Sequence, residues 1–332
     1  MKVLVTGAGG FLGRHVVRAL HRRGHDVRAM VRPAGRADFP DSPSVDVVRA
    51  DLHRTEHVEV AVDGVDAVVH LAAAVGGDQD LQFATTVGGT ERLLAAMKRA
   101  RVARLVLASS IAVYDWERIG DRLTEDSPTV ESINDLDRRG GYTVSKVWQE
   151  RVARRASERD GLALTVMRPG FVWAAGREPL AGIGQRLGPL HLVFGPRRPL
   201  PLTYVENCAD CFAAATASAA AAQQTLNVID DEPVSAWRFT AEYLRRSPAQ
   251  GRRVPVPYAL AVTSARLAQR TSRAAFGESA QLPSILTPAH FEARFKPLSF
   301  TTGRPRAVLG WDAPWSFEAA MDRTYDRPGA DA

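Results

Sequence analysis

Short apolar runs alternate with amphipathic segments through the first half of the chain. The runs are as continuously apolar as strands covered on both faces, and the segments between them repeat apolar residues with the period of a helix. This alternation predicts an α/β fold: a doubly wound parallel sheet with helices on both faces. Val65–Leu71 is nearly all apolar, so we expect it near the centre of the sheet. The other expected strands are Val3–Val5, Val27–Val31, Val45–Val48, Leu105–Ala108, Leu162–Met167 and Thr225–Ile229.

The second half of the chain is less regular and indicates a smaller lobe. Glycine and proline are dense from Pro169 to Pro201, which interrupts regular structure. Helical periodicity returns at Asn207–Ala222, and short helices are expected from Pro255 onward. A polar, acidic stretch from Tyr114 to Gly141 predicts a loop or lid. We therefore predict one domain over residues 1–168, rejoined by 203–230, and a second lobe over residues 169–202 and 231–332.

Composition and charge exclude several classes of protein. The chain has 332 residues, 45% of them hydrophobic, and a formal net charge of +6. Its arginines are scattered and form no stripe interleaved with aromatic residues, so we expect no nucleic-acid partner. No apolar run reaches the ~18 residues of a membrane span, so no stable membrane insertion is expected. The segment Tyr258–Phe276 is amphipathic and either touches a membrane surface or packs as a lid; we favour packing.

The two cysteines, Cys208 and Cys211, are too few for a disulfide scaffold, and a cytoplasmic location is expected. Their spacing also suits a redox pair or half of a zinc site. A zinc site would need a second pair of ligands, and the sequence offers none nearby. We therefore expect partly buried thiols and no metal.

The N-terminal stretch Lys2–Gly13 has the glycine spacing of a dinucleotide-binding turn. Glycines at 7, 10 and 13 stand between a predicted strand and a helical segment. The first permits a tight turn, the second lets the backbone approach a pyrophosphate, and the third lets the helix pack on the strand. The helix N-terminus then offers free N–H groups to the phosphates. A glycine-rich turn without a ligand is the alternative, but the strand–turn–helix context favours a Rossmann-type cofactor site.

The end of the second expected strand indicates which dinucleotide binds. A carboxylate there would bind the ribose 2′-hydroxyl of NAD, whereas an arginine suits a 2′-phosphate. Here Arg32 ends the strand, and Arg36 and Arg14 lie near enough to help. We predict NADP(H), with NAD(H) as the alternative if Arg32 is only a solvated charge. Further contacts are expected from Asp51 and Leu52 to the adenine and from the backbone of Leu71, Ala72 and Ala73; His70 is expected to be a packed strand-end residue.

Three residues form a candidate catalytic group. Tyr142 and Lys146 are four residues apart, which places them on one face of a helix. A neighbouring cation stabilises a phenolate and lowers the tyrosine pKa, so Tyr142 could act as an acid or base near neutral pH. Ser110 follows a predicted strand, and ligands collect at the carboxyl ends of strands in such sheets. The alternative is an exposed helix face, but the ordered set with the glycine turn is more specific.

At this point the chain resembles an extended short-chain dehydrogenase/reductase of the NAD-dependent epimerase/dehydratase family. The resemblance rests on VTGAGGFLG at 5–13, ADL at 50–52, HLAA at 70–73, SSIAVY at 109–114, YTVSK at 142–146 and RPGFVW at 168–173. It implies that Tyr142 is the general acid/base, that Lys146 binds ribose and tunes Tyr142, and that Ser110 holds the reacting oxygen. It also implies dimerisation. The resulting cofactor set is Gly7, Gly10, Phe11, Leu12, Gly13, Arg32, Arg36, Asp51, Leu52, Leu71, Ala72, Ala73, Tyr142, Lys146, Pro169 and Val172.

Departures from the family narrow the activity. Ile111 and Ala112 stand where sugar dehydratases have an acidic pair, and Phe171 stands where nucleotide-sugar epimerases have asparagine. Thr86 replaces an asparagine that helps to organise the active-site helix. The nearest branch is that of the dihydroflavonol-reductase-like and 3β-hydroxysteroid-dehydrogenase-like members.

We therefore predict an NADP(H)-dependent oxidoreductase that interconverts a carbonyl and a secondary alcohol on a small molecule. A nucleotide-sugar epimerase with tightly bound NAD(P) and a non-enzymatic dinucleotide sensor are the alternatives. A bulky, partly apolar substrate is expected from the apolar residues of one region, Phe171, Trp173, Leu187, Leu190, Leu192, Val193 and Phe194.

Overall fold

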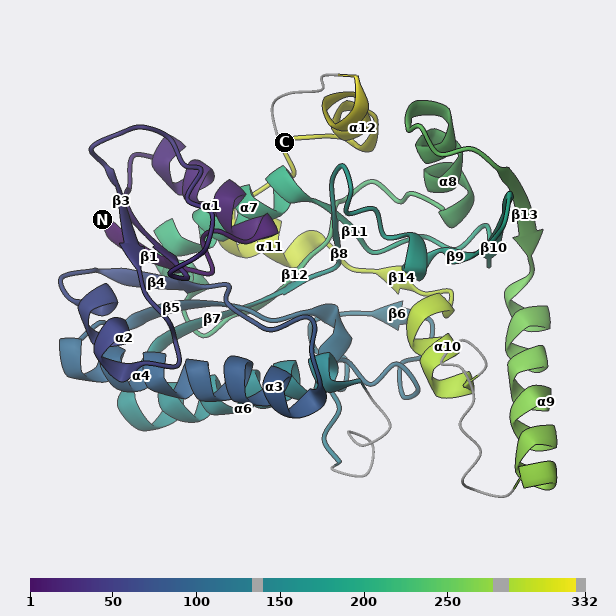
Figure 1. The fold of residues 1–332 in the computed structure, drawn as a ribbon, viewed down its shortest axis with the longest axis horizontal. Helices are drawn as coiled ribbons and strands as arrows, with labels where there is room; N and C mark the ends of the chain where they lie inside the picture. The colour runs from purple at the N-terminus through teal and green to yellow at the C-terminus, as the bar shows by residue number, and fades with distance from the viewer. Residues whose placement is uncertain (133–139, 277–286, 327–332) are drawn as a thin grey trace.

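The computed structural model describes residues 1–132, 140–276 and 287–326. Its central sheet has seven strands, and each neighbouring pair is parallel (Figure 1). The predicted doubly wound sheet is confirmed, and the strand predicted near the centre is the fourth of the seven. The order across the sheet is β12 (Thr225–Val228), β7 (Ala163–Pro169), β5 (Arg104–Ala108), β4 (Ala67–His70), β1 (Lys2–Thr6), β2 (Asp26–Val31) and β3 (Val45–Arg49).

Helices cover both faces of this sheet (Figure 1). On one face α1 (Phe11–Arg22) packs against α7 (Val205–Ala217), with α11 (Gly303–Leu309) beside them. On the other face α2 (Thr55–Val62), α4 (Gly89–Ala100) and α6 (Gly141–Asp160) pack side by side over a second apolar core. The short helix α3 (Gln79–Phe83) continues through a π-helical turn, Ala84–Gly88, into α4. The chain order reverses between β1 and β4, which is where sheets of this kind bind ligands.

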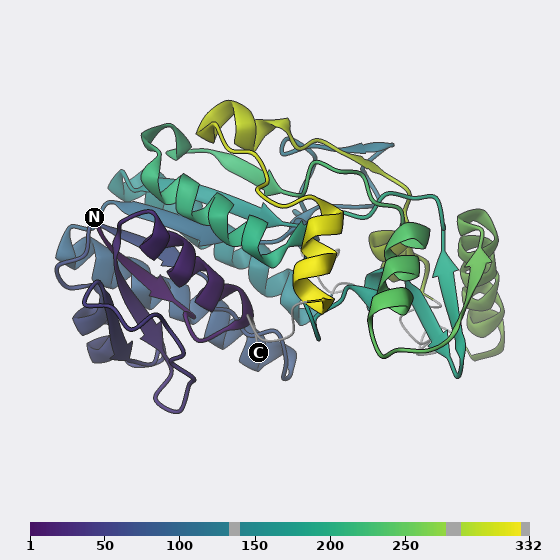
Figure 2. The ribbon, with the colours of Figure 1, turned by 90° about the horizontal axis from the view of Figure 1, so that it is seen from above.

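Several elements from the second half of the chain gather at one end of the molecule (Figure 2). A three-stranded sheet of β9 (Gly184–Leu187), β10 (Leu190–Phe194) and β13 (Arg252–Val256) lies there with α8 (Ala236–Arg246), α9 (Tyr258–Phe276) and α10 (Pro288–Phe295). The expected helix Tyr258–Phe276 is confirmed with the same bounds. The pair β8 (Phe171–Trp173) and β11 (Leu202–Tyr204) is parallel, and α12 (Phe317–Tyr325) ends the described chain. No helix in the described part of the chain combines the length and the apolar character needed to span a bilayer.

Some predicted boundaries were wrong for identifiable reasons. The helix predicted at Asn207–Ala222 begins at Val205 and ends at Ala217. It stops early because the chain must return to the sheet as β12, and Gln223 takes a left-handed conformation (φ 63°) in that return. The predicted loop from Tyr114 to Gly141 contains a short strand, β6 (Arg122–Leu123), which pairs with β14 (Ser299–Phe300). Residues 133–139 of that loop lie outside the described residues.

Candidate active site

The glycine turn after β1 is shaped by two close backbone approaches. Gly7 has a φ of +69°, which disfavours any side chain, and an added Cβ would lie 2.9 Å from the Ala72 nitrogen. A Cβ on Gly13 would lie 2.2 Å from the Gly7 carbonyl oxygen. These contacts seat α1 on the turn and bring the turn against the backbone that follows β4.

The N-terminus of α1 fits a pyrophosphate. Its N-cap is Gly10, no side chain caps the helix, and no acidic residue stands in its first turn. The first N–H groups of a helix have no partner within it, and the dipole makes this end positive. An anionic group therefore has both donors and a favourable potential here.

The turn after β2 lies against the glycine turn. Arg32 and Arg36 are exposed on it, and an added Cβ on Gly9 would lie 2.6 Å from the Arg36 carbonyl oxygen. Arg49 at the end of β3 stabilises the turn. Its Nη1 donates hydrogen bonds to the carbonyl oxygens of Pro33 and Gly35 at 2.7 and 3.2 Å. The structure thus presents two exposed arginines, Arg32 and Arg36, beside the glycine turn.

The residues expected at the adenine and along the cofactor differ in what they can offer. An Asp51 carboxylate oxygen accepts a hydrogen bond from the His53 backbone at 2.9 Å. Leu52 is 8% exposed and packs in the core near Gly89, so its side chain belongs to the fold and only its backbone could meet a ligand. Leu71, Ala72 and Ala73 are half-buried where the chain leaves β4. Pro169 is the last residue of β7, and Val172 lies in β8.

Ser110 and Tyr142 meet at the carboxyl end of β5. Tyr142 is the second residue of α6, and its hydroxyl lies close enough to Ser110 to interact with it. Burial raises the pKa of Tyr142 above its ordinary value near 10, and the interaction with Ser110 opposes this rise. Tyr142 therefore carries its proton at neutral pH.

Lys146 lies one helical turn below Tyr142 and is 3% exposed. Its Nζ donates to the Ala108 carbonyl oxygen at 2.7 Å and to Gln149 Oε1 at 2.9 Å. Burial lowers the pKa of Lys146 to about 8, and the charge of Glu150 opposes this. Burial of the phenol and its interaction with Ser110 set the Tyr142 pKa in this structure, and an effect of Lys146 on that pKa stays a prediction.

Comparison with known proteins agrees with this arrangement. Residues 3–228 match the NAD dependent epimerase/dehydratase family. The chain belongs to this family. It is 32% identical over 274 residues to a 3 beta-hydroxysteroid dehydrogenase/Delta 5-->4-isomerase of Mycobacterium tuberculosis, covering 76% of this chain and 70% of that protein. It is 32% identical over 250 residues to a 2-alkyl-3-oxoalkanoate reductase of Stenotrophomonas maltophilia, covering 70% and 72%.

The fold is also that of solved structures. A short-chain dehydrogenase/reductase superfamily protein of Agrobacterium tumefaciens with bound NAD has a TM-score of 0.71 at 21% identity, covering 98% of this chain and 96% of that one. The chain is thus an NAD(P)-dependent enzyme of the extended short-chain dehydrogenase/reductase type, with an oxidoreductase function.

Sequence reasoning missed a buried ion pair next to the predicted catalytic residues of this dehydrogenase/reductase. Glu150, one turn after Lys146, binds Arg168 of β7 through two hydrogen bonds. The Arg168 guanidinium stacks on the Tyr114 ring at 4.6 Å, and the Tyr114 hydroxyl donates to Asn227 on β12. The i, i+4 spacing of Lys146 and Glu150 was the available signal, because it places a charge of opposite sign on the same helix face.

Thr86 stands inside the π-helical turn between α3 and α4. Its hydroxyl oxygen accepts from the Ala74 backbone at 3.1 Å, and its carbonyl oxygen accepts from the Thr90 hydroxyl at 2.6 Å. Thr86 therefore fixes the loop that follows β4.

Most of the apolar residues expected at the substrate lie elsewhere. Trp173 and Val193 are buried in an apolar core with residues of α8 and α12, and Phe194 is buried in another with residues of α9 and α10. Leu187 and Leu190 are exposed on the β9–β10 hairpin. An apolar run does not show which side of a strand faces a ligand. Phe171, half-buried next to β7 and packed near Ile111, remains at the predicted site.

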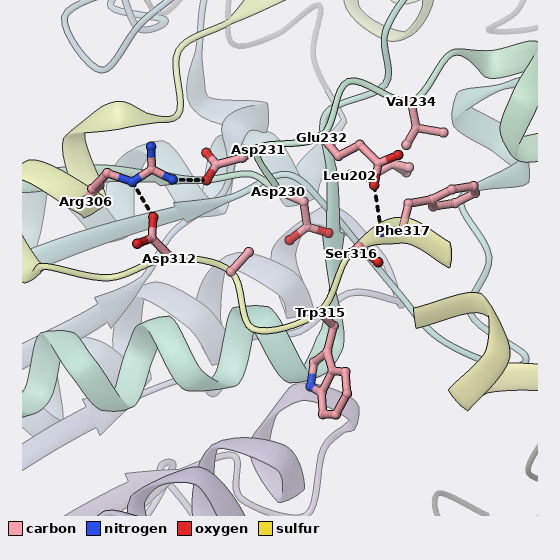
Figure 3. Close-up of a pocket in the computed structure, with 11 residues that line it drawn as sticks. Leu202, Asp230, Asp231, Glu232, Val234, Arg306, Asp312, Trp315, Ser316 and Phe317 are labelled. Carbon is pink, nitrogen blue, oxygen red and sulfur yellow. Dashed lines mark hydrogen bonds and ion pairs between the residues drawn. The ribbon is translucent and has the colours of Figure 1, made fainter. Parts of the chain in front are cut away.

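A separate pocket of about 210 Å³ contains none of the predicted site residues (Figure 3). It lies between the end of β12 and the segment before α12. Its charged groups are engaged: Arg306 binds Asp231 and Asp312, and the backbone of Phe317 donates to Glu232. These bonds fasten the C-terminal segment to the sheet. Among the described residues, no cluster of three or more His, Cys, Asp or Glu side chains is placed to hold a metal ion.

Cys208 and Cys211 are fully buried on α7, deeper than expected, and burial raises the pKa of both thiols well above the ordinary value.

Proposed function

We propose that this enzyme is an NADP(H)-dependent carbonyl reductase or alcohol dehydrogenase. The observation that carries the proposal is the placement of Ser110 beside Tyr142 at the carboxyl end of β5, with Lys146 one turn below. A hydroxyl that holds an oxygen and a phenol that exchanges its proton are what carbonyl reduction requires beside a hydride donor.

The roles of the residues follow from their positions. When bound, the nicotinamide supplies or accepts the hydride. Ser110 would hold the carbonyl oxygen, and the Tyr142 hydroxyl would donate its proton to that oxygen as negative charge develops on it. In the reverse direction Tyr142 would remove the alcohol proton. Ile111 and Ala112 next to Ser110 have no group that moves a proton, so a coupled dehydration lacks its acid or base.

The exposed pair Arg32 and Arg36 supports a preference for NADP(H). Both guanidinium groups lie on a turn that touches the glycine turn, where a 2′-phosphate on the adenosine ribose would meet them.

The names of the relatives support a bulky, partly apolar substrate. The name of one relative contains a hydroxysteroid and that of the other a 2-alkyl-3-oxoalkanoate. A dehydrogenase that acts on a hydroxyl group and a reductase that acts on a keto group both interconvert an alcohol and a ketone. Phe171, beside the loop after β7, is the apolar side chain best placed to contact such a molecule.

Nucleotide titration followed by a substrate screen tests the proposal. Wild type, Arg32→Ala and the distant control Arg252→Ala are titrated with NADPH and NADH by ligand fluorescence. We expect tighter binding of NADPH than of NADH, with the difference lost only in Arg32→Ala. Ketone reduction should then fall at least ~100-fold in Tyr142→Phe while NADPH binding persists. Equal affinity for both nucleotides would remove the NADP(H) preference. Nucleotide that co-purifies and does not exchange, with no net turnover, would favour an epimerase.

A further inference from the structure

A buried chain of hydrogen bonds joins Lys146 to the residue before the glycine turn. Gln149, with no exposed surface, lies in the middle of this chain and contacts Lys146 and Thr90. Thr90 in turn contacts His70, and His70 contacts Thr6, the last residue of β1. The contacts are Lys146 Nζ–Gln149 Oε1 at 2.9 Å, Gln149 Nε2–Thr90 Oγ1 at 2.9 Å, His70 Nε2–Thr90 Oγ1 at 2.8 Å and Thr6 Oγ1–His70 Nδ1 at 2.6 Å.

The chemistry of these groups fixes the direction of every bond. An ammonium only donates, so the oxygen of the Gln149 amide must face Lys146 and its nitrogen must donate to Thr90. The single hydroxyl proton of Thr90 goes to the Thr86 carbonyl oxygen at 2.6 Å. Thr90 Oγ1 is therefore an acceptor toward both Gln149 and His70, and His70 carries its proton on Nε2. Its Nδ1 then accepts from the Thr6 hydroxyl, and burial lowers the pKa of this neutral imidazole to about 3.

This directional order excludes a proton path away from Lys146. An amide does not pass a proton on, and the Thr90 proton is committed to a backbone carbonyl. Gln149 instead satisfies one N–H of the Lys146 ammonium, and the Ala108 carbonyl satisfies a second. The third N–H would be available to a hydroxyl of the cofactor ribose.

We propose that Gln149 is the positioning residue that orients the Lys146 ammonium and keeps it charged. The inference rests on the proposed function for its catalytic consequence, although the contact itself does not depend on any substrate. The buried hydrogen bonds continue to His70 of β4 and Thr6 of β1, so they fix the position of the Lys146 ammonium relative to the glycine turn.

The other ionisable groups around Lys146 do not replace Gln149. On α6, the charge of Glu150 raises the pKa of Lys146 from a distance, but the Glu150 oxygens are bound to Arg168 of β7 and do not orient the ammonium. Tyr142 is neutral because burial raises its pKa. From β4, His70 is neutral and donates to Thr90. Among the described residues, the Gln149 amide oxygen is therefore the side-chain group that accepts a hydrogen bond directly from the Lys146 ammonium.

Direct titration of Lys146 tests the proposal without a substrate. The chain has four lysines, Lys2, Lys98, Lys146 and Lys296, so protein labelled with carbon-13 at the lysine ε-carbon gives a resolvable NMR spectrum. The signal of Lys146 is assigned as the one that is absent from the spectrum of the Lys146→Met variant. The variants are Gln149→Met, which removes the acceptor, and Gln149→Glu, which makes it anionic. The matched control is Gln223→Met, because Gln223 also accepts from a serine and donates to a backbone carbonyl, but away from the site.

We expect Gln149→Met to lower the pKa of Lys146 by about one pH unit and Gln149→Glu to raise it by a similar amount, with Gln223→Met unchanged. An unchanged Lys146 titration in both Gln149 variants would overturn the proposal. If Gln149→Met does not fold, Gln149→Glu alone decides it.

A second readout separates this proposal from the proposed function. The alkaline limb of the pH profile of NADPH binding, and of ketone reduction where it occurs, should move to lower pH in Gln149→Met and to higher pH in Gln149→Glu. A purely structural role would reduce activity equally at every pH. Absence of ketone reduction in wild type would count against the proposed function, whereas the NMR result would still decide the role of Gln149.

Discussion

Glu150 and Arg168 form a two-point ion pair inside the protein. Glu150 Oε1 accepts from Arg168 Nε at 2.9 Å and Glu150 Oε2 accepts from Nη2 at 2.7 Å, and the side chains are 7% and 4% exposed. The pair joins α6, which carries Tyr142 and Lys146, to β7, whose end leads to the predicted cofactor contacts Pro169 and Val172. Arg168 holds the pKa of Glu150 below its ordinary value despite burial.

Arg168→Met should destabilise the fold strongly, because it leaves the Glu150 carboxylate buried without its partner. We expect a loss of about 3 to 5 kcal/mol in the free energy of unfolding, measured by urea denaturation. The double variant Glu150→Gln with Arg168→Met should lose less than Arg168→Met alone. As a control, Arg159→Met breaks an exposed pair with Asp160 and should leave the midpoint unchanged. Equal midpoints for Arg168→Met and Arg159→Met would contradict the role of the buried pair.

The two directions of the reaction should differ in their pH dependence. Burial keeps the proton on Tyr142, so it is a ready acid for ketone reduction but must lose that proton to act as a base in alcohol oxidation. Reduction should therefore be nearly flat across neutral pH, and oxidation should increase with pH into the alkaline range. Ser110→Ala removes the interaction that lowers the pKa of Tyr142, so the oxidation profile should move to still higher pH. Steady-state rates between pH 6 and 8, below the titration of Lys146, check this, and an oxidation rate that falls over that range would contradict it.

Arg49 should influence nucleotide preference without touching the nucleotide. It holds the carbonyl oxygens of Pro33 and Gly35, and so supports the turn that bears Arg32 and Arg36. We expect Arg49→Met to weaken NADPH binding several-fold more than NADH binding, measured by fluorescence titration. Arg28→Met is the matched control, because Arg28 also donates to backbone carbonyls, those of Val60, Ala61 and Asp63, away from the turn. Identical losses in the two variants would show that Arg49 acts only on general stability.

The sequence was most informative where the pattern is local. The glycine turn and the buried strands were predicted correctly because a strand, a turn and a helix within a few residues specify one another. The Gln149–Thr90 contact could not be predicted, since its partners are 59 residues apart and meet only when α4 packs on α6. Trp173 was assigned to the substrate because apolar character does not distinguish a residue that lines a site from one in the core.

Asp230 should make the stability of the fold decrease as the pH rises from about 4 to 7. Burial raises its pKa from an ordinary 3.8 to about 7, although its oxygens accept from the Tyr204 backbone and from Asn207. Between these values the folded protein holds a proton that the unfolded chain has released, so each step upward in pH favours unfolding. Figure 3 shows this carboxyl in the wall of the pocket beside Glu232 and Asp231.

Two buried histidines change the stability of the fold with pH in the opposite direction to Asp230, so their contribution must be separated from that of Asp230. Burial lowers the pKa of His15 to about 4 and that of His70 to about 3, so both increase stability as the pH rises toward 6.5. The difference between wild type and Asp230→Asn cancels their contribution. Relative to wild type, Asp230→Asn should gain roughly 2 kcal/mol between pH 5 and 8, measured by urea denaturation at each pH. A difference that stays constant over this range would show that Asp230 is already ionised in the folded protein at pH 5, and that its two N–H donors outweigh its burial.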